Sequence, residues 1–544
     1  MFFDLDAYEK FRMTKEETAL LDEAEKEQKK AKEEAEKKAA DDKKGKKTKE
    51  EEKKKEVEPL EFDLDNCRDR VIRLTVNSSN LGDAILTPKG DKLYYTARFE
   101  GTPDLWMHDL KEGSTSIVLK GVGRGELLTD KDFKNVFLAS EKGIKKIDVE
   151  KKSTKNVDFE ATFNYKASKE REYIFSHVWQ QVADKFYKPD LHGVDWEGMR
   201  KNYSRFLPYI NNNYDYAEMM CELLGELNAS HTGMRYSAPS GRLATANLGV
   251  FIDDTYRGDG IKIDEVIAKG PFAVKKTDVK AGSIIEKIDG KAITKDMDYY
   301  PLLEGKAGKP VRVSVLNPDG RRFDVTVKAI STGERTNLLY DRWVERNKKK
   351  VEELSGGKIA YVHVRAMDSP SFRRVYRDLL SDENRQRQAA VVDERHNSGG
   401  WLHDDLCTLL AGKAYQRFMP RGQYIGTDPY NKWVKPSCVL ICEDDYSNGH
   451  GFPWVYKTLG IGKLIGTPVA GTMTAVWWER VIDNTLVFGI PQVGCVDMQG
   501  RYQENLQLEP DMAVYNTPEE MLQGIDRQLE AAVKEMMRQS SSSN

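Results

Sequence analysis

The chain has 544 residues, 39% of them hydrophobic and 32% charged, and this length exceeds what one compact core accommodates. Its 85 Lys and Arg nearly balance 88 Asp and Glu, which provides neither a basic field for nucleic acid nor an acidic excess for cationic partners. We therefore expect several domains and no nucleic-acid partner.

The cysteines and the apolar stretches bear on the cellular location of the chain. Six cysteines are spread thinly, without a CxxC pair or a histidine spacing typical of zinc, so the sequence predicts buried thiols, no metal and no cofactor. No stretch approaches the ~18 apolar residues of a membrane span, and the first residues lack a signal-peptide pattern. We expect a cytoplasmic protein with no membrane partner; a longer native N-terminus would leave an exported or periplasmic location open.

The first segments are poor in apolar residues. Residues 1–21 contain an FDLD sequence that returns at 62–65, and they are unassigned apart from a candidate propeller strand. Residues 22–57 contain almost nothing apolar except alanine, so burial cannot offset the entropy of ordering. This composition predicts a linker that is disordered or forms a solvated helix.

Residues 58–160 are predicted to form short strands joined by turns. LTPKGDKLYY at 86–95 aligns with LTDKDFKNVF at 128–137, an offset of 42 residues. A period of about 40 to 45 residues is typical of a β-propeller blade, and a β-meander fits as well. One or two blades cannot close a ring of about 4 to 8, so we expect the chain to be the C-terminal part of something longer.

Two small domains are predicted next. REYIFSHVWQQVADKFY and YDYAEMMCELLGELNAS space their apolar residues three and four apart, which predicts a helical domain over 161–244. Short strands around one helix follow over 245–332 and predict a β-rich domain.

Residues 333–538 alternate apolar strands with amphipathic helices. This pattern predicts β-α-β units whose sheet is covered on both faces, with ligand chemistry where strands lead into loops. The fold class is therefore multidomain α+β, and residues 539–544 are expected to be a disordered tail.

Two strand ends carry candidate catalytic groups. Ser447 follows the strand CVLIC at 438–442, where its hydroxyl would be exposed beside the free N–H groups of a helix N-terminus. A plain N-cap is the alternative, and spacing alone favours it. Gly399 and Gly400 follow the strand AAVVDE and would let backbone N–H groups approach a substrate oxygen, although the same pair fits an ordinary turn.

A serine nucleophile requires a base. His450 would share a helical turn with Ser447, where the two side chains rarely aim at each other. His231 ends a predicted helix at a glycine-containing loop and suits a base or a helix cap equally well. Sequence alone does not choose among the eight histidines, which are His108, His177, His192, His231, His363, His396, His403 and His450.

Four segments, taken in order, resemble the tricorn peptidases of the S41 class. They are LGELNASHTG, VVDERHNSGG, DDYSNGHGF with TLGIGKLIGTPVAG, and YQENLQLEPDMAV. The resemblance covers residues 160–535. It implies the end of a propeller before residue 160, a PDZ-like domain at 245–332 and a C-terminal α/β catalytic domain of the S41 or crotonase-like type.

The resemblance also implies an activity, namely a serine peptidase that hydrolyses unfolded peptides or oligopeptides through an acyl-enzyme. In that case Ser447 is the nucleophile, His231 the general base, and Ser230 and Glu504 complete a tetrad. Members of the family assemble as hexamers, so a homo-oligomer is expected.

Two binding elements follow from the same resemblance. The oxyanion hole would consist of the backbone N–H of Asn448 with one from Gly399 or Gly400. The carboxylate-binding loop of the PDZ-like domain would be Leu248-Gly249-Val250-Phe251, which either adds a peptide as a strand or only shapes the cleft.

The chain departs from the family at two points. Asn448 stands where the family usually has an aspartate, and the backbone N–H is unaffected by that change. Archaeal members use an acidic pocket residue to select basic substrates, and the sequence does not assign that acid among Asp404, Asp405 and Asp428.

Three alternatives are kept. C-terminal processing peptidases of the same class use a Ser-Lys dyad, yet Lys463 comes too early after the serine and the next lysine is Lys534. An inactive PDZ scaffold that binds peptides is opposed by the presence of every residue type that the tetrad needs. A crotonase-like acyl-CoA enzyme explains neither the PDZ-like insert nor Ser447.

Overall fold

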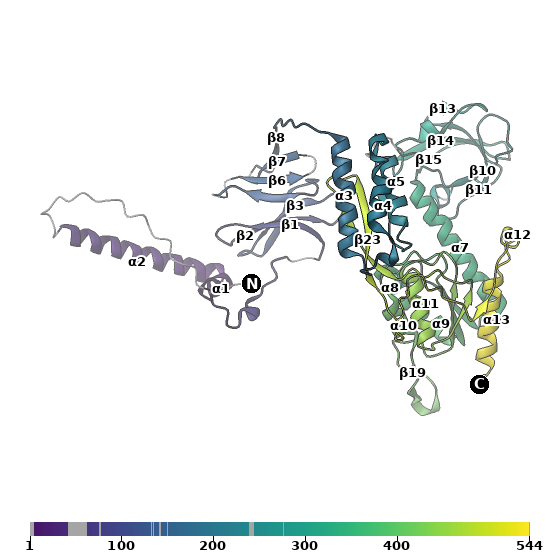
Figure 1. Cartoon of the computed structure of the whole chain (residues 1–544). Helices are drawn as coiled ribbons and strands as arrows, with labels where there is room; N and C mark the ends of the chain where they lie inside the picture. The colour runs from purple at the N-terminus through teal and green to yellow at the C-terminus, as the bar shows by residue number, and fades with distance from the viewer. Residues whose placement is uncertain are drawn as a thin grey trace. The chain divides into compact units, whose positions relative to one another are not determined.

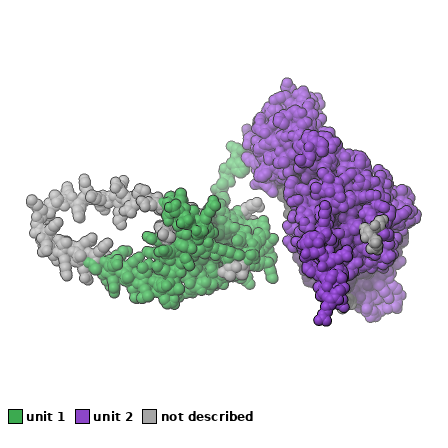
Figure 2. Space-filling model, turned by 90° about the horizontal axis from the view of Figure 1, so that it is seen from below, with its two compact units in different colours: residues 1–164 green, residues 165–544 purple. Residues whose placement is uncertain are grey.

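The computed structural model describes residues 5–41, 62–75, 78–131, 133, 135–140, 143–149, 151–238, 244–275 and 277–542. The chain forms two compact units, Met1–Asn164 and Tyr165–Asn544, which Figure 2 colours separately. Each unit has buried apolar clusters of its own and is described by itself.

The first unit begins with helices, not with a strand. Helix α1 spans Leu5–Arg12 and helix α2 spans Lys15–Asp41. Thr14 and Glu17 cap α2 reciprocally, because each backbone N–H donates to the side chain of the other (2.8 and 3.2 Å). The expectation of a propeller strand is therefore wrong for the described part of residues 1–21, since Glu, Lys and Ala are strong helix formers. Residues 42–57 of the expected linker lie outside the described residues.

Two antiparallel four-stranded sheets follow, in the orders β1-β2-β3-β4 and β5-β6-β7-β8 (Figure 1). Each repeat copy predicted from the sequence runs from the first into the second strand of its sheet, and these two strands pair antiparallel in both sheets. The Leu127 N–H donates to Asp83 Oδ2 (2.8 Å) and joins the two sheets. The strands are β1 (Asn80–Leu86), β2 (Lys92–Arg98), β3 (Asp104–Asp109), β4 (Ser114–Leu119), β5 (Glu126–Thr129), β6 (Val136–Ser140), β7 (Gly143–Asp148) and β8 (Ser153–Val157).

The second unit starts with the predicted helices α3 (Ala167–Lys185), α4 (Trp196–Ser204) and α5 (Asn213–Gly225). Their apolar faces pack on a three-stranded sheet in the order β22-β23-β9 (Figure 1). Strand β9 (Met234–Tyr236) belongs to this segment, whereas β22 (Thr474–Arg480) and β23 (Leu486–Gly494) come from near the end of the chain. The core of the helical domain is thus completed by C-terminal strands, including the buried Phe488 and Ile490.

The predicted β-rich domain has one antiparallel sheet in the order β10-β11-β12-β14-β15, with β13 paired to β12. Its core is built from Ile, Val and Leu side chains that alternate along the strands. Its elements are β10 (Val250–Ile252), β11 (Ile261–Val266), α6 (Pro271–Val274), β12 (Ile284–Ile288), β13 (Lys291–Ala292), the 3-10 turn η4 (Tyr300–Leu303), β14 (Pro310–Leu316) and β15 (Arg322–Lys328).

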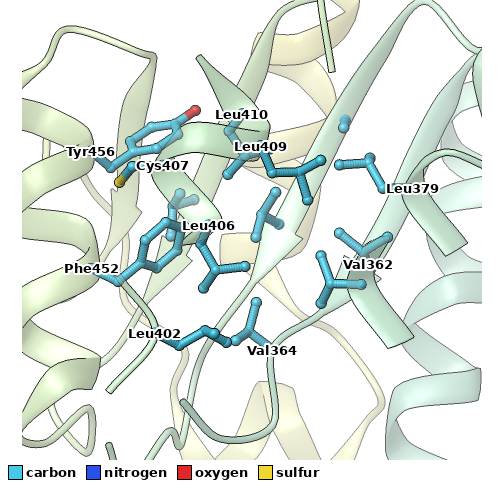
Figure 3. Close-up of a cluster of buried hydrophobic side chains, with 14 of the residues drawn as sticks. Val362, Val364, Leu379, Leu402, Leu406, Cys407, Leu409, Leu410, Phe452 and Tyr456 are labelled. Carbon is cyan, nitrogen blue, oxygen red and sulfur yellow. The ribbon is translucent and has the colours of Figure 1, made fainter. Parts of the chain in front are cut away.

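A parallel five-stranded sheet in the order β16-β17-β20-β21-β24 forms the last domain. Every residue of β16, β17 and β20 is buried, because helices cover both faces. Figure 3 shows the core on one face, where Phe452 lies beside Leu406, Tyr456 lies beside Cys407, and Val362 and Val364 belong to the same cluster. The strands are β16 (Ile359–His363), β17 (Ala389–Asp393), β20 (Ser437–Ile441), β21 (Lys463–Gly466) and β24 (Met512–Ala513), with β18 (Gln416–Phe418) and β19 (Gly426–Asp428) in a separate hairpin.

Different helices cover the two faces of the parallel sheet. The face shown in Figure 3 is covered by α8 (Ser369–Leu379), α10 (His403–Leu410) and α11 (Asn448–Thr458). The opposite face is covered by α7 (Thr332–Ser355) and α13 (Arg527–Ser542). The short helices α9 (Asp382–Gln386) and α12 (Pro518–Leu522) lie in connections.

Helix α13 corrects one expectation. It continues through residues 539–542, which were predicted to be disordered, and Ser540 and Ser541 donate their hydroxyl protons to the Met537 carbonyl oxygen within it. None of the helices in the described part of the chain combines the length and the apolar character that crossing a bilayer demands.

Candidate active site

A sharp turn between β20 and α11 carries Ser447. Its φ of 60° and ψ of −121° form a conformation that L-residues rarely adopt. The side chain makes no capping hydrogen bond to α11, although Ser447 occupies the N-cap position. Its N–H donates to Thr472 Oγ1 (2.9 Å). The hydroxyl is therefore not used as a helix cap, contrary to the interpretation that spacing alone favours.

The segment after β17 approaches this turn closely. Gly399 has a φ of +93°, and a Cβ on it would lie 2.6 Å from Ser447 Cβ and 2.7 Å from the Tyr446 carbonyl oxygen. Gly400 has a φ of +134°, and a Cβ on it would lie 2.2 Å from the Met367 carbonyl oxygen. Both positions require glycine, because a side chain on Gly399 would push the segment away from the turn that carries Ser447 and one on Gly400 would collide with Met367.

The backbone N–H groups of Asn448 and Gly400, both at this junction, have no hydrogen-bond acceptor among the described residues. The Gly399 N–H donates to Asn397 Oδ1 (2.9 Å) and is occupied. The Asn448 nitrogen lies only 3.0 Å from where a Gly399 Cβ would be, so the free donors flank the serine. Of the two glycines proposed for an oxyanion hole, Gly400 is therefore the one with an available N–H.

His231 comes from the loop between α5 and β9 and has a φ of +62°. Strand β9 pairs with β23, so the loop is held by the C-terminal part of the chain. Gly489 of β23 permits this contact, because a Cβ on it would lie 2.2 Å from the His231 carbonyl oxygen. The pairing explains how a residue of the helical domain reaches the catalytic domain.

Tyr446 links His231 to the nucleophile turn. The His231 N–H donates to the Tyr446 hydroxyl oxygen (2.6 Å), and the two ring centroids are 4.7 Å apart. Tyr446 directly precedes Ser447, so the predicted base and nucleophile belong to one site. Neither Ser447 Oγ nor His231 Nε2 has a hydrogen-bond partner among the described residues. Catalytic hydrogen bonds of this kind often form only in the substrate complex.

Glu504 and Ser230 order the other side of the imidazole. The Glu504 carboxylate accepts the Ser230 N–H (2.5 Å) and the Ser230 hydroxyl (3.0 Å). The Ser230 proton is thus committed to Glu504, and Ser230 Oγ, 2.7 Å from His231 Nδ1, accepts the Nδ1 proton. Thr474 Oγ1 lies 3.1 Å from the same nitrogen. The arrangement selects the tautomer with the proton on Nδ1, which leaves Nε2 free to accept one.

Burial shifts the pKa values of both His231 and Glu504. Burial, helped by the positive charge of Arg235, lowers the pKa of His231 to about 4, so the imidazole is neutral at pH 7. Burial also raises the pKa of Glu504, and its hydrogen bonds from Ser230 oppose that shift. A neutral imidazole with a free Nε2 is the form that a general base requires.

The Asn448 side chain connects the segment after Gly400 to the turn that carries Ser447. Its Oδ1 accepts the N–H groups of Leu402 and His403 (2.7 and 3.1 Å), and its Nδ2 lies 2.8 Å from His403 Nδ1. Helix α10 begins at His403 and has no cap of its own, so Asn448 supplies it. The amide found here in place of the family's aspartate therefore has a defined structural role.

Sequence reasoning missed several residues of this site. Tyr446, Thr472 and Asn397 each form a hydrogen bond with a predicted site residue. Thr474 Oγ1 lies within hydrogen-bond distance of both Ser230 Oγ (3.2 Å) and His231 Nδ1 (3.1 Å). Thr472 precedes strand β22 and Thr474 begins it, and neither belongs to a motif. The aromatic residue directly before Ser447 was the only signal available, and its partner could not be named without the fold.

Three family models match the chain in order. The tricorn protease C1 domain matches residues 167–225, the tricorn protease PDZ domain matches 250–332, and peptidase family S41 matches 358–514. The chain is a tricorn-type member of peptidase family S41.

Curated relatives show the same likeness. The tricorn protease homolog 1 of Streptomyces coelicolor is 28% identical over 372 residues, which are 66% of this chain and 34% of that protein. The tricorn protease of Thermoplasma volcanium is 26% identical over 373 residues, 66% of this chain and 36% of that protein. The chain thus spans about a third of the length of the curated relatives it matches.

The fold is that of a solved relative. The crystal structure of the tricorn protease superposes with a TM-score of 0.73 at 21% identity and covers 90% of this chain and 49% of that one. The partial propeller, helical domain, PDZ domain and α/β domain expected from the sequence are confirmed as a tricorn-type architecture.

The tricorn PDZ domain keeps its predicted loop in a tight conformation. Leu248 is buried in the domain core, and Gly249 has a φ of +70° with its N–H donated to Asn247 Oδ1 (2.8 Å). Val250 and Phe251 continue into β10 and line a cavity of about 390 Å³ beside η4. We call this cavity the PDZ groove.

The remaining candidate residues, a lysine for a Ser-Lys dyad and three carboxylates for a substrate pocket, lie outside the turn that carries Ser447. Lys463 forms an ion pair with Glu535 (2.9 Å) at the start of β21, which disfavours a Ser-Lys dyad. Asp404 and Asp405 lie in the first turn of α10, and Asp428 accepts a hydrogen bond from Gln416. Among the described contacts, none of these three carboxylates bonds to the nucleophile turn.

Proposed function

We propose that the chain is a serine peptidase that hydrolyses unfolded peptides through an acyl-enzyme. Ser447 is the nucleophile, His231 the general base and then the general acid, and Ser230 with Glu504 orients the imidazole. The single observation that carries the proposal is the hydrogen-bond relay from Glu504 through Ser230 to His231 Nδ1, because a proton held on Nδ1 leaves Nε2 free to accept one.

These groups account for each bond and proton in the proposed reaction. Nε2 of His231 takes the Ser447 proton as the Ser447 oxygen bonds to the scissile carbonyl carbon. The carbonyl oxygen becomes an oxyanion, which the free N–H groups of Asn448 and Gly400 stabilise. The carbon–nitrogen bond then breaks, and His231 gives its proton to the leaving amine. Water, deprotonated by the same imidazole, releases the acyl group.

The PDZ groove supports a peptide substrate. Arg335, from helix α7, lines this groove and lies 5.0 Å from the Phe251 ring centroid. A guanidinium at this place would attract the terminal carboxylate of a peptide added beside β10. We infer that the domain binds substrate ends. A peptide with a free C-terminus should bind more tightly than its amide, and Arg335→Ala should abolish that difference.

Active-site labelling tests the proposal directly. The full chain should react with a fluorophosphonate at Ser447, located by peptide mass spectrometry, and should cleave denatured casein. Ser447→Ala should lose both, whereas Ser369→Ala, an exposed serine on α8, should keep both. Cleavage that persists in Ser447→Ala would refute the assignment. Labelling without turnover of any unfolded peptide would favour a peptide-binding scaffold.

The assembly and the location stay predictions. A hexamer is expected only from the family, and light scattering of the full chain measures it. A cytoplasmic location is equally an expectation from the sequence.

A further inference from the structure

A cluster of three different ligand types lies behind the nucleophile turn. His396, Cys442 and Asp444 offer a ring nitrogen, a sulfur and a carboxylate oxygen that all lie within 4.8 Å of one another. His396 belongs to the segment that leads from β17 to Gly400, and the other two belong to the segment that leads from β20 to Ser447. The proposed peptidase mechanism uses none of the three.

The distances in the cluster are close to those of a metal site. His396 Nδ1 lies 2.9 Å from Asp444 Oδ2 and 3.8 Å from Cys442 Sγ. In a tetrahedral zinc site, bonds of about 2.0 to 2.3 Å place neighbouring ligand atoms roughly 3.3 to 3.6 Å apart. Shifts of a few tenths of an ångström would satisfy both distances, and the Asp444 side chain, which is 67% exposed, has room to move.

The surroundings of Cys442 bear on metal binding. Its sulfur is buried, accepts the His396 backbone N–H (3.2 Å), which would also stabilise a thiolate on a metal, and lies 3.7 Å from Asp445 Oδ1. Burial and Asp445 raise the pKa of the thiol, so a bound ion must displace its proton. His396 has a φ of +67°, which few L-residues other than Asn, Asp and His adopt. His396 and Cys442 also line a cavity of about 430 Å³, which gives access to an ion and room for a water as the fourth ligand.

We propose that His396, Cys442 and Asp444 form a zinc-binding site. Sulfur and imidazole ligands select zinc over magnesium and calcium, which prefer oxygen. Binding replaces the Cys442 thiol proton, which is released to solvent, and removes the proton shared by His396 and Asp444. The bound ion would join the two segments that present the oxyanion donors and the nucleophile.

The spacing of these residues conceals the site in the sequence. The histidine lies 46 positions before the cysteine, and no CxxC or paired-histidine pattern marks either. The expectation of no metal rested on that missing pattern, whereas parallel strands bring the two positions to one edge of the sheet.

Cobalt substitution tests the proposal without relying on peptidase activity. The full chain, freed of metal with a chelator, should bind one Co²⁺ and develop a thiolate-to-cobalt charge-transfer band that Zn²⁺ abolishes and Mg²⁺ does not. Cys442→Ser should lose the band. His396→Gln and Asp444→Asn, both at exposed positions, should fold normally and bind cobalt at least ~10-fold more weakly.

Cys67→Ser is the matched control, because Cys67 is a free, half-buried thiol in the other unit, and it should retain the band. The absence of the band in the wild-type chain would overturn the proposal. So would a band of full strength in Cys442→Ser, or wild-type affinity in both His396→Gln and Asp444→Asn.

Discussion

Glu504→Gln tests how the imidazole is set for catalysis. The Ser230 N–H, 2.5 Å from one carboxylate oxygen, requires an acceptor, so the amide oxygen of glutamine must take that place. The amide NH₂ then faces Ser230 Oγ, which at present donates to Glu504. The Ser230 hydroxyl must therefore turn and donate to His231 Nδ1. This reversal favours the tautomer with the proton on Nε2, which cannot accept a proton from Ser447.

The magnitude follows from the geometry. Glutamate and glutamine have nearly the same volume, so the variant should unfold at nearly the wild-type denaturant concentration. A carboxylate-to-amide change in a Ser-His-Asp triad lowers kcat by about 10⁴ through the wrong tautomer. Here Thr474 Oγ1, 3.1 Å from His231 Nδ1, can still accept the Nδ1 proton. We expect a loss of about 10²- to 10³-fold for Glu504→Gln and a larger one for Glu504→Gln with Thr474→Val.

The rate of fluorophosphonate labelling at Ser447 is the assay, because it reports nucleophile activation without knowledge of the preferred substrate. Nitrogen-15 NMR of labelled histidine reports the His231 tautomer in the same samples. Labelling of Glu504→Gln within threefold of the wild-type rate would refute the reasoning. So would a wild-type His231 with its proton on Nε2.

Three further predictions use other parts of the site. Asn448→Ala should lower the free energy of unfolding by about 1–3 kcal/mol, measured in urea, because α10 loses its cap. The labelling rate should be constant near neutral pH and fall below about pH 4 as His231 becomes protonated, and Arg235→Gln should move that fall to higher pH. Burial lowers the pKa of His450 to about 4, so its contribution to stability is present above pH ~6.5 and is lost as the pH falls toward 4. The free energy of unfolding of the wild type should therefore fall between pH 7 and pH 5, and in His450→Leu this fall should be smaller by about 2 kcal/mol, measured by denaturation at both pH values. An unchanged pH dependence in either variant would contradict the corresponding explanation.

Much of the fold follows from local patterns. The apolar runs that became β16, β17 and β20 are followed by helical periodicity, and this alternation predicts a covered parallel sheet. The 42-residue repeat likewise predicts two equivalent sheets. The helix at the start of the chain was missed because a short FDLD repeat suggested a strand, whereas the Thr14 cap and the charged sequence after it favour a helix.

The site was harder to predict, because its members lie far apart in the sequence. Ser447 and the glycine pair carry local signals at strand ends, but residue patterns do not choose His231 among eight histidines. That choice needed the family resemblance. Thr474 could not be found at all, because its proximity to His231 depends on the pairing of β22, β23 and β9.

The shared sheet β22-β23-β9 also constrains how the chain is made. The helices over residues 167–225 leave the ribosome long before residues 486–494, which supply the buried Phe488 and Ile490 beneath them. At about 5 to 20 residues per second, synthesis of the intervening segment takes tens of seconds. During that interval the early helices expose an apolar face, so a nascent chain stalled before β23 is expected to bind chaperones and to resist recovery as a separate fragment.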